Sequence, residues 1–323
     1  MFYSIFRSFV KLGLQWYVTD WQIGKLNQID YNRPTLIVSN HPNSFFDAVI
    51  IAAFAPTKIR FLARGDVFKH PIANWALRTF FMLPIYKRND DREAQIKNAF
   101  TYDECVRQLD QGVNIFIFPE GISRNQFTIG PFMPSGVTSI MTKAIQRDVP
   151  IQIQPYIIGY NSFNKLPKTV SLEAVQAIDC TDYMQGGELQ SVTILTKLKD
   201  SMVNAAIERP TEPSLELSKS KQWMRIPALI GKVTHNWFYQ MIKKQIMKKT
   251  TGTIFFDSLL FGVLLFSYPL IILLLSVLIG NIFGFWWGVF IFLLFPSLSY
   301  CWVHDQKMGI DEQTEEGRAN VFN

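Results

Sequence analysis

The chain has 323 residues, a formal net charge of +6 and 14% aromatic residues, a composition that allows one large domain with an appendage. A basic, aromatic-rich chain suits an anionic membrane surface or an anionic substrate, and the absence of a dense Lys/Arg tract argues against nucleic-acid binding. The three cysteines lie far apart and the four histidines form no metal-spaced cluster, so we expect no disulfide framework and no metal site.

Residues 1–29 are predicted to contain an amphipathic helix. Polar side chains recur on one helical stripe, and Phe, Ile, Val and Leu cover most of the remaining surface; the polar positions are Ser4, Arg7, Ser8, Lys11 and Gln15. The pattern favours a helix that lies in a membrane interface. The alternative is a helix that packs on its own domain. A signal peptide is not indicated, because no small-residue cleavage site follows the apolar stretch.

Residues 30–207 are predicted to form one domain in which short strands alternate with helices. Strands are expected at 35–39, 59–63, 82–86, 114–118 and 151–160, and helices at roughly 45–55, 71–80, 91–111 and 136–147. This alternation predicts an α/β fold with a mixed, mostly parallel sheet and flanking helices. Functional side chains in such sheets gather at the carboxyl ends of the strands.

The stretch VSNHPNSFFDAVII places His41 directly after the first of these strands and Asp47 six positions later. Regular helical spacing would not bring the two side chains together, but a turn at Pro42 with a helix cap at Asn43 or Ser44 removes that objection. Asp47 would then accept the Nδ1 proton of His41 and leave Nε2 as a general base. The bland alternative is a chance pair on the surface.

Two more strands end in polar residues. The segment NIFIFPEGISRN places Glu120 and Gly121 at a strand end, followed by Ser123 and Arg124. In the segment MLPIYKRND the predicted strand is followed by Lys87 and Arg88, which predicts a clamp for a phosphate group. The alternative is a solvated charge pair. The predicted binding residues are Lys87, Arg88, Glu120, Gly121, Ser123 and Arg124.

Residues 208–253 are interpreted as a connecting and basic juxtamembrane segment, which leads to a two-helix membrane hairpin at 254–303. Runs 258–279 and 282–303 each hold 22 residues without a charge, which is the length needed to cross about 30 Å of hydrocarbon. Only Gly280 and Asn281 separate the two runs. Four lysines precede the hairpin: Lys243, Lys244, Lys248 and Lys249. They predict that both ends of the hairpin, and the tail at 304–323, lie on the cytoplasmic side. These lysines either set the topology alone or also contact anionic lipid.

The order of these segments resembles the phospholipid/glycerol acyltransferase family, over roughly residues 30–205. NHPNSFFD resembles its first block, with five rather than four residues between His and Asp, and FFMLPIYKR its second, with Arg88 as the matching arginine. FLARGDVFKHPIANWALR is similar to the stretch before that strand. FPEGISRN resembles the third block, although Arg124 comes one place late, and PFMPSGVTSIMTKA resembles the helix that follows without its usual lysine. VPIQIQPYIIGY resembles the fourth.

The resemblance implies transfer of an acyl group from acyl-CoA or acyl carrier protein to a glycerol hydroxyl, with lysophosphatidate as the expected acceptor and no cofactor. It implies that His41 is the base and Asp47 its partner, that Arg88 with Lys87 binds the acceptor phosphate, and that Glu120 and Gly121 position the glycerol. Glycerol-3-phosphate, another lysophospholipid or an amine lipid are alternative acceptors. A catalytically silent lipid-binding membrane protein is a further alternative, and a serine hydrolase is disfavoured because no G-x-S-x-G is present. We expect membrane lipids, the thioester and the phosphate-bearing acceptor as partners, at the cytoplasmic membrane.

Overall fold

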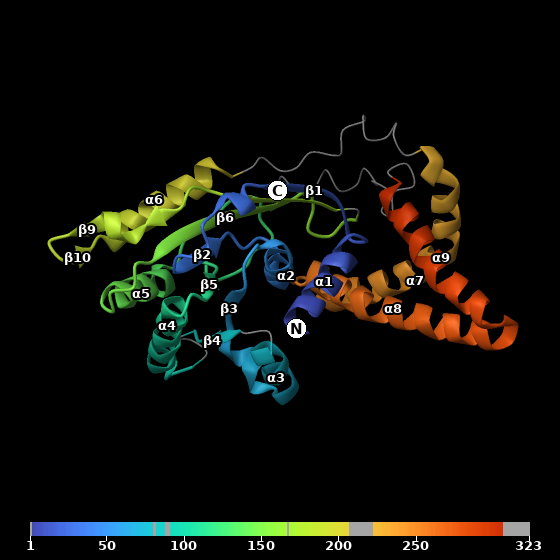
Figure 1. Cartoon of the computed structure of the whole chain (residues 1–323), viewed down its shortest axis with the longest axis horizontal. Helices are drawn as coiled ribbons and strands as arrows, with labels where there is room; N and C mark the ends of the chain where they lie inside the picture. Colours follow the sequence, from blue (N-terminus) through green and yellow to red (C-terminus); the bar gives the residue numbers. More distant parts are fainter. Residues whose placement is uncertain (1, 80–81, 88–90, 167, 207–221, 306–323) are drawn as a thin grey trace. The chain divides into compact units, whose positions relative to one another are not determined.

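The computed structural model describes residues 2–79, 82–87, 91–166, 168–206 and 222–305 (Figure 1). These residues form two compact units. The first contains residues 1–7, 22–159 and 171–208, and the second contains residues 8–21, 160–170 and the described part of 209–323. Each unit is taken below by itself.

The described chain contains one large sheet, a small second sheet and nine α-helices. The strands are β1 (Val18–Gly24), β2 (Thr35–Ser39), β3 (Ile59–Arg64), β4 (Leu83–Ile85), β5 (Asn114–Ile117), β6 (Gln152–Tyr160), β7 (Lys168–Ala174), β8 (Ile178–Asp179), β9 (Met184–Gln185) and β10 (Glu188–Leu189). The helices are α1 (Phe2–Leu14), α2 (Ser44–Phe54), α3 (Pro71–Thr79), α4 (Ala94–Asp110), α5 (Pro134–Ile145), α6 (Ser191–Asn204), α7 (Arg225–Thr250), α8 (Phe256–Phe283) and α9 (Phe285–His304). Short 3₁₀ turns include η2 (Gly65–Lys69).

The large sheet has the order β1-β7-β6-β2-β5-β3-β4, with β8 paired to β6. Strand β2 is parallel to β5 and β6, and β3 is parallel to β5 and β4, whereas β8 is antiparallel to β6. The predicted α/β class with a mixed, mostly parallel sheet is therefore confirmed, and all five predicted strands are present within a residue or two of their expected ends.

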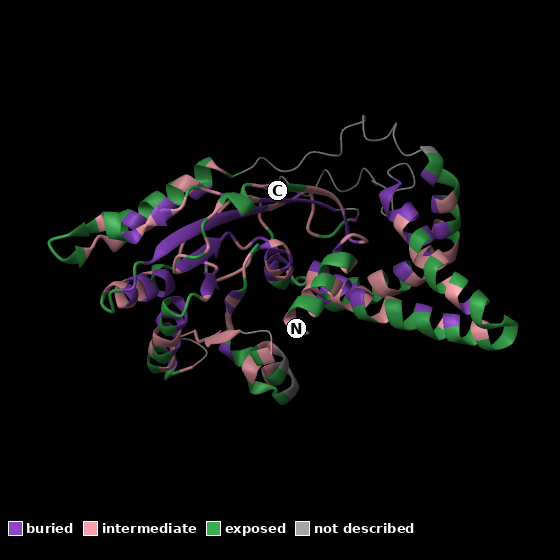
Figure 2. Ribbon diagram, in the orientation of Figure 1, coloured by how far each residue is buried: buried purple, intermediate pink, exposed green. Residues whose placement is uncertain are grey.

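The direction of each crossover decides which face of the sheet each helix covers. Helices α2 and α3 connect strands that advance from β2 toward β4, while α4 and α5 connect strands that return toward β6. Because such crossovers are right-handed, the two pairs must cover opposite faces. The main core cluster agrees, since it joins alternate sheet residues such as Leu36, Val38 and Ile115 to buried residues of α4, α5 and α6 and includes none from α2. Figure 2 shows the sheet buried along its centre.

The strand register brings several strand ends to one level. Val38 of β2 lies opposite Ile117 of β5, and Leu62 of β3 lies opposite Leu83 of β4. Because Phe61 lies opposite Phe116, these four positions share one row. Three residues beyond that row come His41, Glu120, Gly65 and Tyr86, which follow four neighbouring parallel strands at the same edge.

In the second unit, α8 and α9 are the two described helices that are long and apolar enough to cross a membrane. They pack against each other as the predicted hairpin. The turn was predicted at Gly280 and Asn281, but α8 continues to Phe283 and the chain reverses at Gly284, whose φ is 107°. The two helices pack closely below this turn, since a Cβ on Gly288 would lie 2.6 Å from the carbonyl oxygen of Ser276.

Helix α1 packs against α8 within this unit. Leu14 is fully buried, and the rings of Phe9 and Phe266 lie 6.1 Å apart. A Cβ on Gly13 would collide with the side chain of Leu265. The amphipathic helix predicted near the amino terminus is therefore present, and part of its surface contacts the chain's own apolar helix.

A buried ion pair connects three distant segments of the second unit. Lys168 and Asp257 are both fully buried, with Nζ 2.7 Å from Oδ2. The hydroxyl of Tyr17 donates to the Oδ1 atom of Asp257 at 2.7 Å, and Lys168 Nζ also donates to the carbonyl of Ser162 at 2.7 Å. Asp257 lies in the first turn of α8, where the helix dipole stabilises a carboxylate. The pair fixes the start of α8 to β7 and to the chain that follows α1.

Replacing Lys168 with Met is predicted to destabilise the protein by about 3–5 kcal/mol, because Asp257 would stay buried without its counter-charge. Thermal unfolding of the detergent-solubilised chain measures the effect. Lys165→Met is the matched control, since its side chain is exposed in the same loop. Equal unfolding midpoints for the two variants would contradict the assignment.

Candidate active site

The structure brings His41 and Asp47 together at the carboxyl end of β2. The Nδ1 atom of His41 lies 2.8 Å from the Oδ2 atom of Asp47. Asp47 is fully buried, and its Oδ2 atom also accepts the backbone N–H of Asn43 at 2.8 Å. A carboxylate that accepts two hydrogen bonds requires the proton on Nδ1, which leaves Nε2 of His41 as the basic nitrogen.

A second contact fixes the plane of the imidazole. The rings of His41 and Phe118 are stacked, with centroids 3.7 Å apart and planes 8° apart. The His41 side chain retains 17% exposure, while Asp47 holds its Nδ1 edge and Phe118 covers one face of the ring. This arrangement suits a general base, because only one nitrogen is free and its direction is set.

The turn between the two residues contains a strained backbone. Ser44 has a φ of 51°, in the left-handed region that a residue other than glycine seldom adopts. The N–H of Ser44 donates to the Oγ atom of Ser123 at 2.7 Å, which holds this conformation from the loop after β5. The left-handed residue turns the chain between His41 and Asp47, which is how positions six apart come into contact.

Glu120 supports the same turn through a hydrogen bond to its backbone. It is buried, and its Oε1 atom accepts the backbone N–H of His41 at 3.0 Å. Burial raises the pKa of Glu120, while the His41 N–H partly opposes that shift. A Cβ on Gly130 would lie 2.5 Å from the Oε2 atom, so the absence of a side chain there makes room for the carboxylate. Glu120 thus contacts the backbone of the residue that supplies the base. Its predicted contact with the glycerol part of the acceptor stays a prediction.

Gly121 and Arg124 lie in the loop that follows. Gly121 has a φ of 64°, and a Cβ there would lie 2.7 Å from the Sδ atom of Met133. The backbone N–H of Arg124 donates to the carbonyl of His41 at 3.3 Å. Its guanidinium is exposed and makes no ion pair with the described residues. With Ser123 and Glu120, the loop therefore holds the His41 turn at three points.

Asn40 is a positioning residue that the sequence patterns did not reveal. Its Nδ2 atom donates to the carbonyl of Ile158 at 2.9 Å, and its Oδ1 atom accepts the N–H of Ile158 at 2.9 Å. The amide thereby extends the pairing of β2 with β6 one residue past the end of β2. The signal was a buried polar residue at the end of an apolar strand, directly before the histidine.

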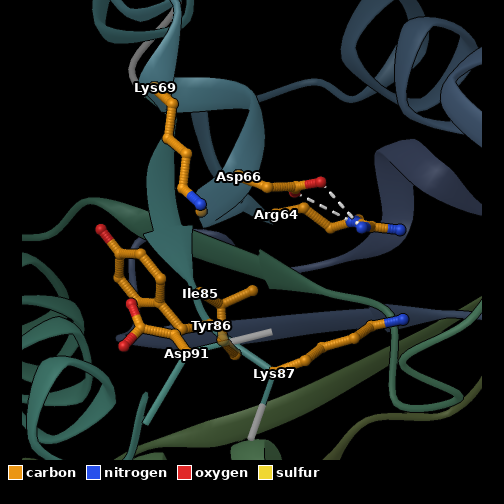
Figure 3. A pocket seen from close by; sticks show the side chains of 8 residues that line it. Arg64, Asp66, Lys69, Ile85, Tyr86, Lys87 and Asp91 are labelled. Carbon is orange, nitrogen blue, oxygen red and sulfur yellow. Dashed lines mark hydrogen bonds and ion pairs between the residues drawn. The ribbon is translucent and has the colours of Figure 1, made fainter. Parts of the chain in front are cut away.

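Lys87 lines a small pocket at the same sheet edge. The other charged residues that line it are Arg64, Asp66, Lys69 and Asp91 (Figure 3). The neighbours differ in their pairing: Arg64 donates to Asp66 through Nε at 3.0 Å and Nη2 at 2.8 Å, and Asp91 accepts from Lys97 at 2.8 Å. The predicted partner Arg88 lies outside the described residues.

Lys69 and Lys87 form no ion pair with any residue that the structure describes, so the pocket offers two ammonium groups to an anion. Lys69 comes from η2 and Lys87 from the end of β4 (Figure 3). Strand β3 lies two places from β2 and β4 lies three, which is about 10–15 Å at the usual strand spacing. The sequence did not single out Lys69, because its place in the same pocket as Lys87 depends on the pairing of β3 with β4.

Comparison with known proteins confirms the resemblance inferred from the sequence blocks. Residues 21–159 match the family model described as Acyltransferase. A chloroplastic 1-acyl-sn-glycerol-3-phosphate acyltransferase of Brassica napus is 30% identical over 42% of this chain and 37% of its own length. A lyso-ornithine lipid O-acyltransferase of Pseudomonas aeruginosa is 29% identical over 40% of this chain and 44% of its own length.

The crystal structure of the 1-acyl-sn-glycerophosphate acyltransferase PlsC from Thermotoga maritima shares 20% identity and a TM-score of 0.47, over 65% of this chain and 81% of its own. The chain spans about two fifths of the length of the Brassica and Pseudomonas relatives. The site described here, from His41 to Gly130, lies inside the matched segment.

The raised pKa of Glu120 predicts a pH-dependent stability. The folded chain holds this proton to higher pH than the unfolded chain, whose carboxyl titrates near its ordinary value of 4.5. The contribution of Glu120 to the free energy of unfolding therefore falls as pH rises from about 4.5 through the folded pKa of Glu120, and this contribution is constant above that pKa. Thermal unfolding of Glu120→Gln and of the unaltered protein between acid and neutral pH tests this. The variant should lack that part of the slope, and parallel profiles would contradict the prediction.

Proposed function

We propose that this protein is an O-acyltransferase that moves a fatty acyl group from a thioester to the free hydroxyl of a glycerolipid, with lysophosphatidate as its acceptor. The observation that carries the proposal is the His41–Asp47 hydrogen bond of 2.8 Å at a strand end inside the acyltransferase-like segment. A base with one free nitrogen is what an alcohol needs in order to attack a thioester.

In the proposed reaction, Nε2 of His41 removes the acceptor's hydroxyl proton as the oxygen attacks the thioester carbonyl carbon. A carbon–oxygen bond forms, and the carbon–sulfur bond then breaks. The imidazolium, stabilised by Asp47, returns its proton to the departing sulfur, so the enzyme ends unchanged. Thiols are acidic, with a pKa of about 8.5, so the departing sulfur requires little help, and the scheme uses no cofactor.

The acceptor is assigned from the charge of the pocket. A phosphate monoester carries close to two negative charges, and Lys69 and Lys87 supply two ammonium groups at the sheet edge that holds His41. The name of the Brassica relative refers to this acceptor class, while that of the Pseudomonas relative refers to lyso-ornithine lipid. Glycerol-3-phosphate and other lysophospholipids are the alternative acceptors, and acyl-CoA or acyl carrier protein is the donor.

The proposal places the enzyme at the cytoplasmic membrane, with its catalytic residues on the cytoplasmic side. Support comes from α8 and α9, which are long and apolar enough to cross a bilayer, and from the lysines at the end of α7. A membrane-held enzyme meets an acyl donor and a lysolipid at one interface, which lowers the entropic cost of bringing them together. A silent lipid-binding protein is disfavoured, because it would have no use for an oriented histidine.

His41→Ala and Asp47→Asn are each predicted to lower kcat about 10²–10⁴-fold, since both remove an oriented general base. The assay combines the purified full chain in detergent, labelled acyl-CoA or acyl carrier protein, and lysophosphatidate. Two exposed positions supply matched controls, His70→Ala and Asp110→Asn, which should retain full activity. Unaltered turnover in His41→Ala would refute the base assignment.

Lys69→Gln and Lys87→Gln are each predicted to raise KM for lysophosphatidate about 10–150-fold, because a charge-assisted contact contributes roughly 1.5–3 kcal/mol. Lyso-ornithine lipid and lysophosphatidylcholine, tested alongside, should respond less. Lys58→Gln is the control, since this exposed lysine precedes β3 at the opposite edge of the sheet. If all acceptors are affected equally, the pocket does not recognise phosphate.

A further inference from the structure

Helix α7 has one face that packs inside the second unit. Its buried residues include Ala228, Gly231, His235 and Tyr239. A Cβ on Gly231 would collide with the carbonyl of Leu298 in α9, so the two backbones are in close contact. The sequence patterns predicted only a connecting and basic segment here, because the apolar residues of α7 are spread over two faces.

The opposite face of α7 carries an apolar stripe that no described part of the second unit covers. The stripe residues recur every three or four positions, and several are far more exposed than apolar side chains usually are (Figure 2). The stripe consists of Ile226 (75% exposed), Ile230 (46%), Val233 (73%), Trp237 (67%) and Met241 (44%).

The stripe is too short for a membrane span. It covers 226–241, about 24 Å at 1.5 Å per residue, whereas crossing the hydrocarbon requires about 30 Å. Lys232 and Asn236 lie along one side of it. A helix with an apolar stripe of this length beside a polar one suits the surface of a bilayer, with its apolar side chains among the acyl chains.

The contacts of α7 lie between the middle of the hairpin and its ends, away from its tip. His235 Nε2 lies 3.0 Å from the hydroxyl of Tyr268 in the first half of α8, and the Tyr239 and Trp302 rings lie 6.1 Å apart. Tyr268 lies near the middle of α8 and Trp302 in the last turn of α9, and both contacts are distant from the tip at Gly284. Helix α7 therefore packs on the half of the hairpin that contains its two ends, which is the half that would meet a membrane surface.

The stripe ends in a basic cluster. Lys244 and Lys248 continue its line by helical spacing, and Lys243 and Lys249 flank them. Lysine stems can lie along lipid while their ammonium groups reach anionic headgroups. The helix thus changes from apolar to cationic on one side, as expected if it tilts out of the acyl-chain region near Met241.

We propose that α7 is a third lipid-contacting element, which lies in the interface of the membrane with the stripe from Ile226 to Met241 against acyl chains and the lysine cluster against anionic headgroups. Helix α8 of the same unit also exposes apolar residues, such as Leu274. This inference rests on the membrane association in the proposed function.

Site-directed fluorescence tests the inference on the full chain. Cys105, Cys180 and Cys301 are first replaced by Ala, and single cysteines are then introduced at Val233 and Trp237 and labelled with a polarity-sensitive fluorophore. Asn236→Cys is the matched control, one position away on the polar side, and Leu274→Cys reports on the hairpin. The chain is reconstituted into phosphatidylcholine–phosphatidylglycerol vesicles, with or without lipids that carry a doxyl quencher on the acyl chain.

The expected result is loss of fluorescence to the doxyl lipid at positions 233, 237 and 274, with little loss at 236. Quenching at 274 alone would overturn the inference and leave the hairpin in place, whereas no quenching at any position would overturn the membrane association itself. Quenching at all four positions would show full immersion and contradict the interfacial orientation. Labels at 233 and 237 that aqueous iodide and doxyl lipid both fail to quench would assign the stripe to a protein partner.

Discussion

The hydrogen bond between His41 and Asp47 is the interaction on which the proposed chemistry depends, and it exists only because the chain between them leaves regular geometry. Continuous strand or helix would direct two side chains six positions apart away from each other. Ser44 accepts a left-handed conformation, and the surrounding residues hold it there: Ser123 through the Ser44 N–H and Glu120 through the His41 N–H. Asn40, the residue before His41, is held to β6 by its side-chain amide. The strain is local, and its supports come from the loop after β5 and from β6.

Parallel strand pairing explains why these supports arrive together. The residues after β2, β5, β3 and β4 share one level, so a base, a buried carboxylate and a cationic pocket occur at one edge although up to 79 positions separate them in the chain. Each crossover helix begins at or soon after this edge. The fold therefore supplies the juxtaposition, and the side chains at the strand ends supply the chemistry.

Continuous apolar runs made the central strands predictable from sequence, because strands buried on both faces carry Val, Ile and Phe without interruption. The same rule fails for β7, where KTVSLEA mixes polar and apolar residues and Lys168 is buried through an ion pair that sequence cannot display. Helix α7 was missed because its apolar residues divide between a packed face and an exposed one. At the site, residue types and order indicated His41, Asp47 and Glu120. The bond from Glu120 to the His41 backbone and the role of Lys69 depend on register and backbone angles, which no residue pattern specifies.

The ion pair of Lys168 and Asp257 has a consequence for how the chain is made. Synthesis at roughly 5–20 residues per second separates the two charges by about ten seconds, and Tyr17 emerges before either of them. Until the first turn of α8 has been translated, the lysine lacks the carboxylate that neutralises it in the finished protein. Completion of this part of the fold is thus coupled to arrival of the first apolar helix, and a nascent chain released early would expose an incomplete, charge-bearing core to proteases.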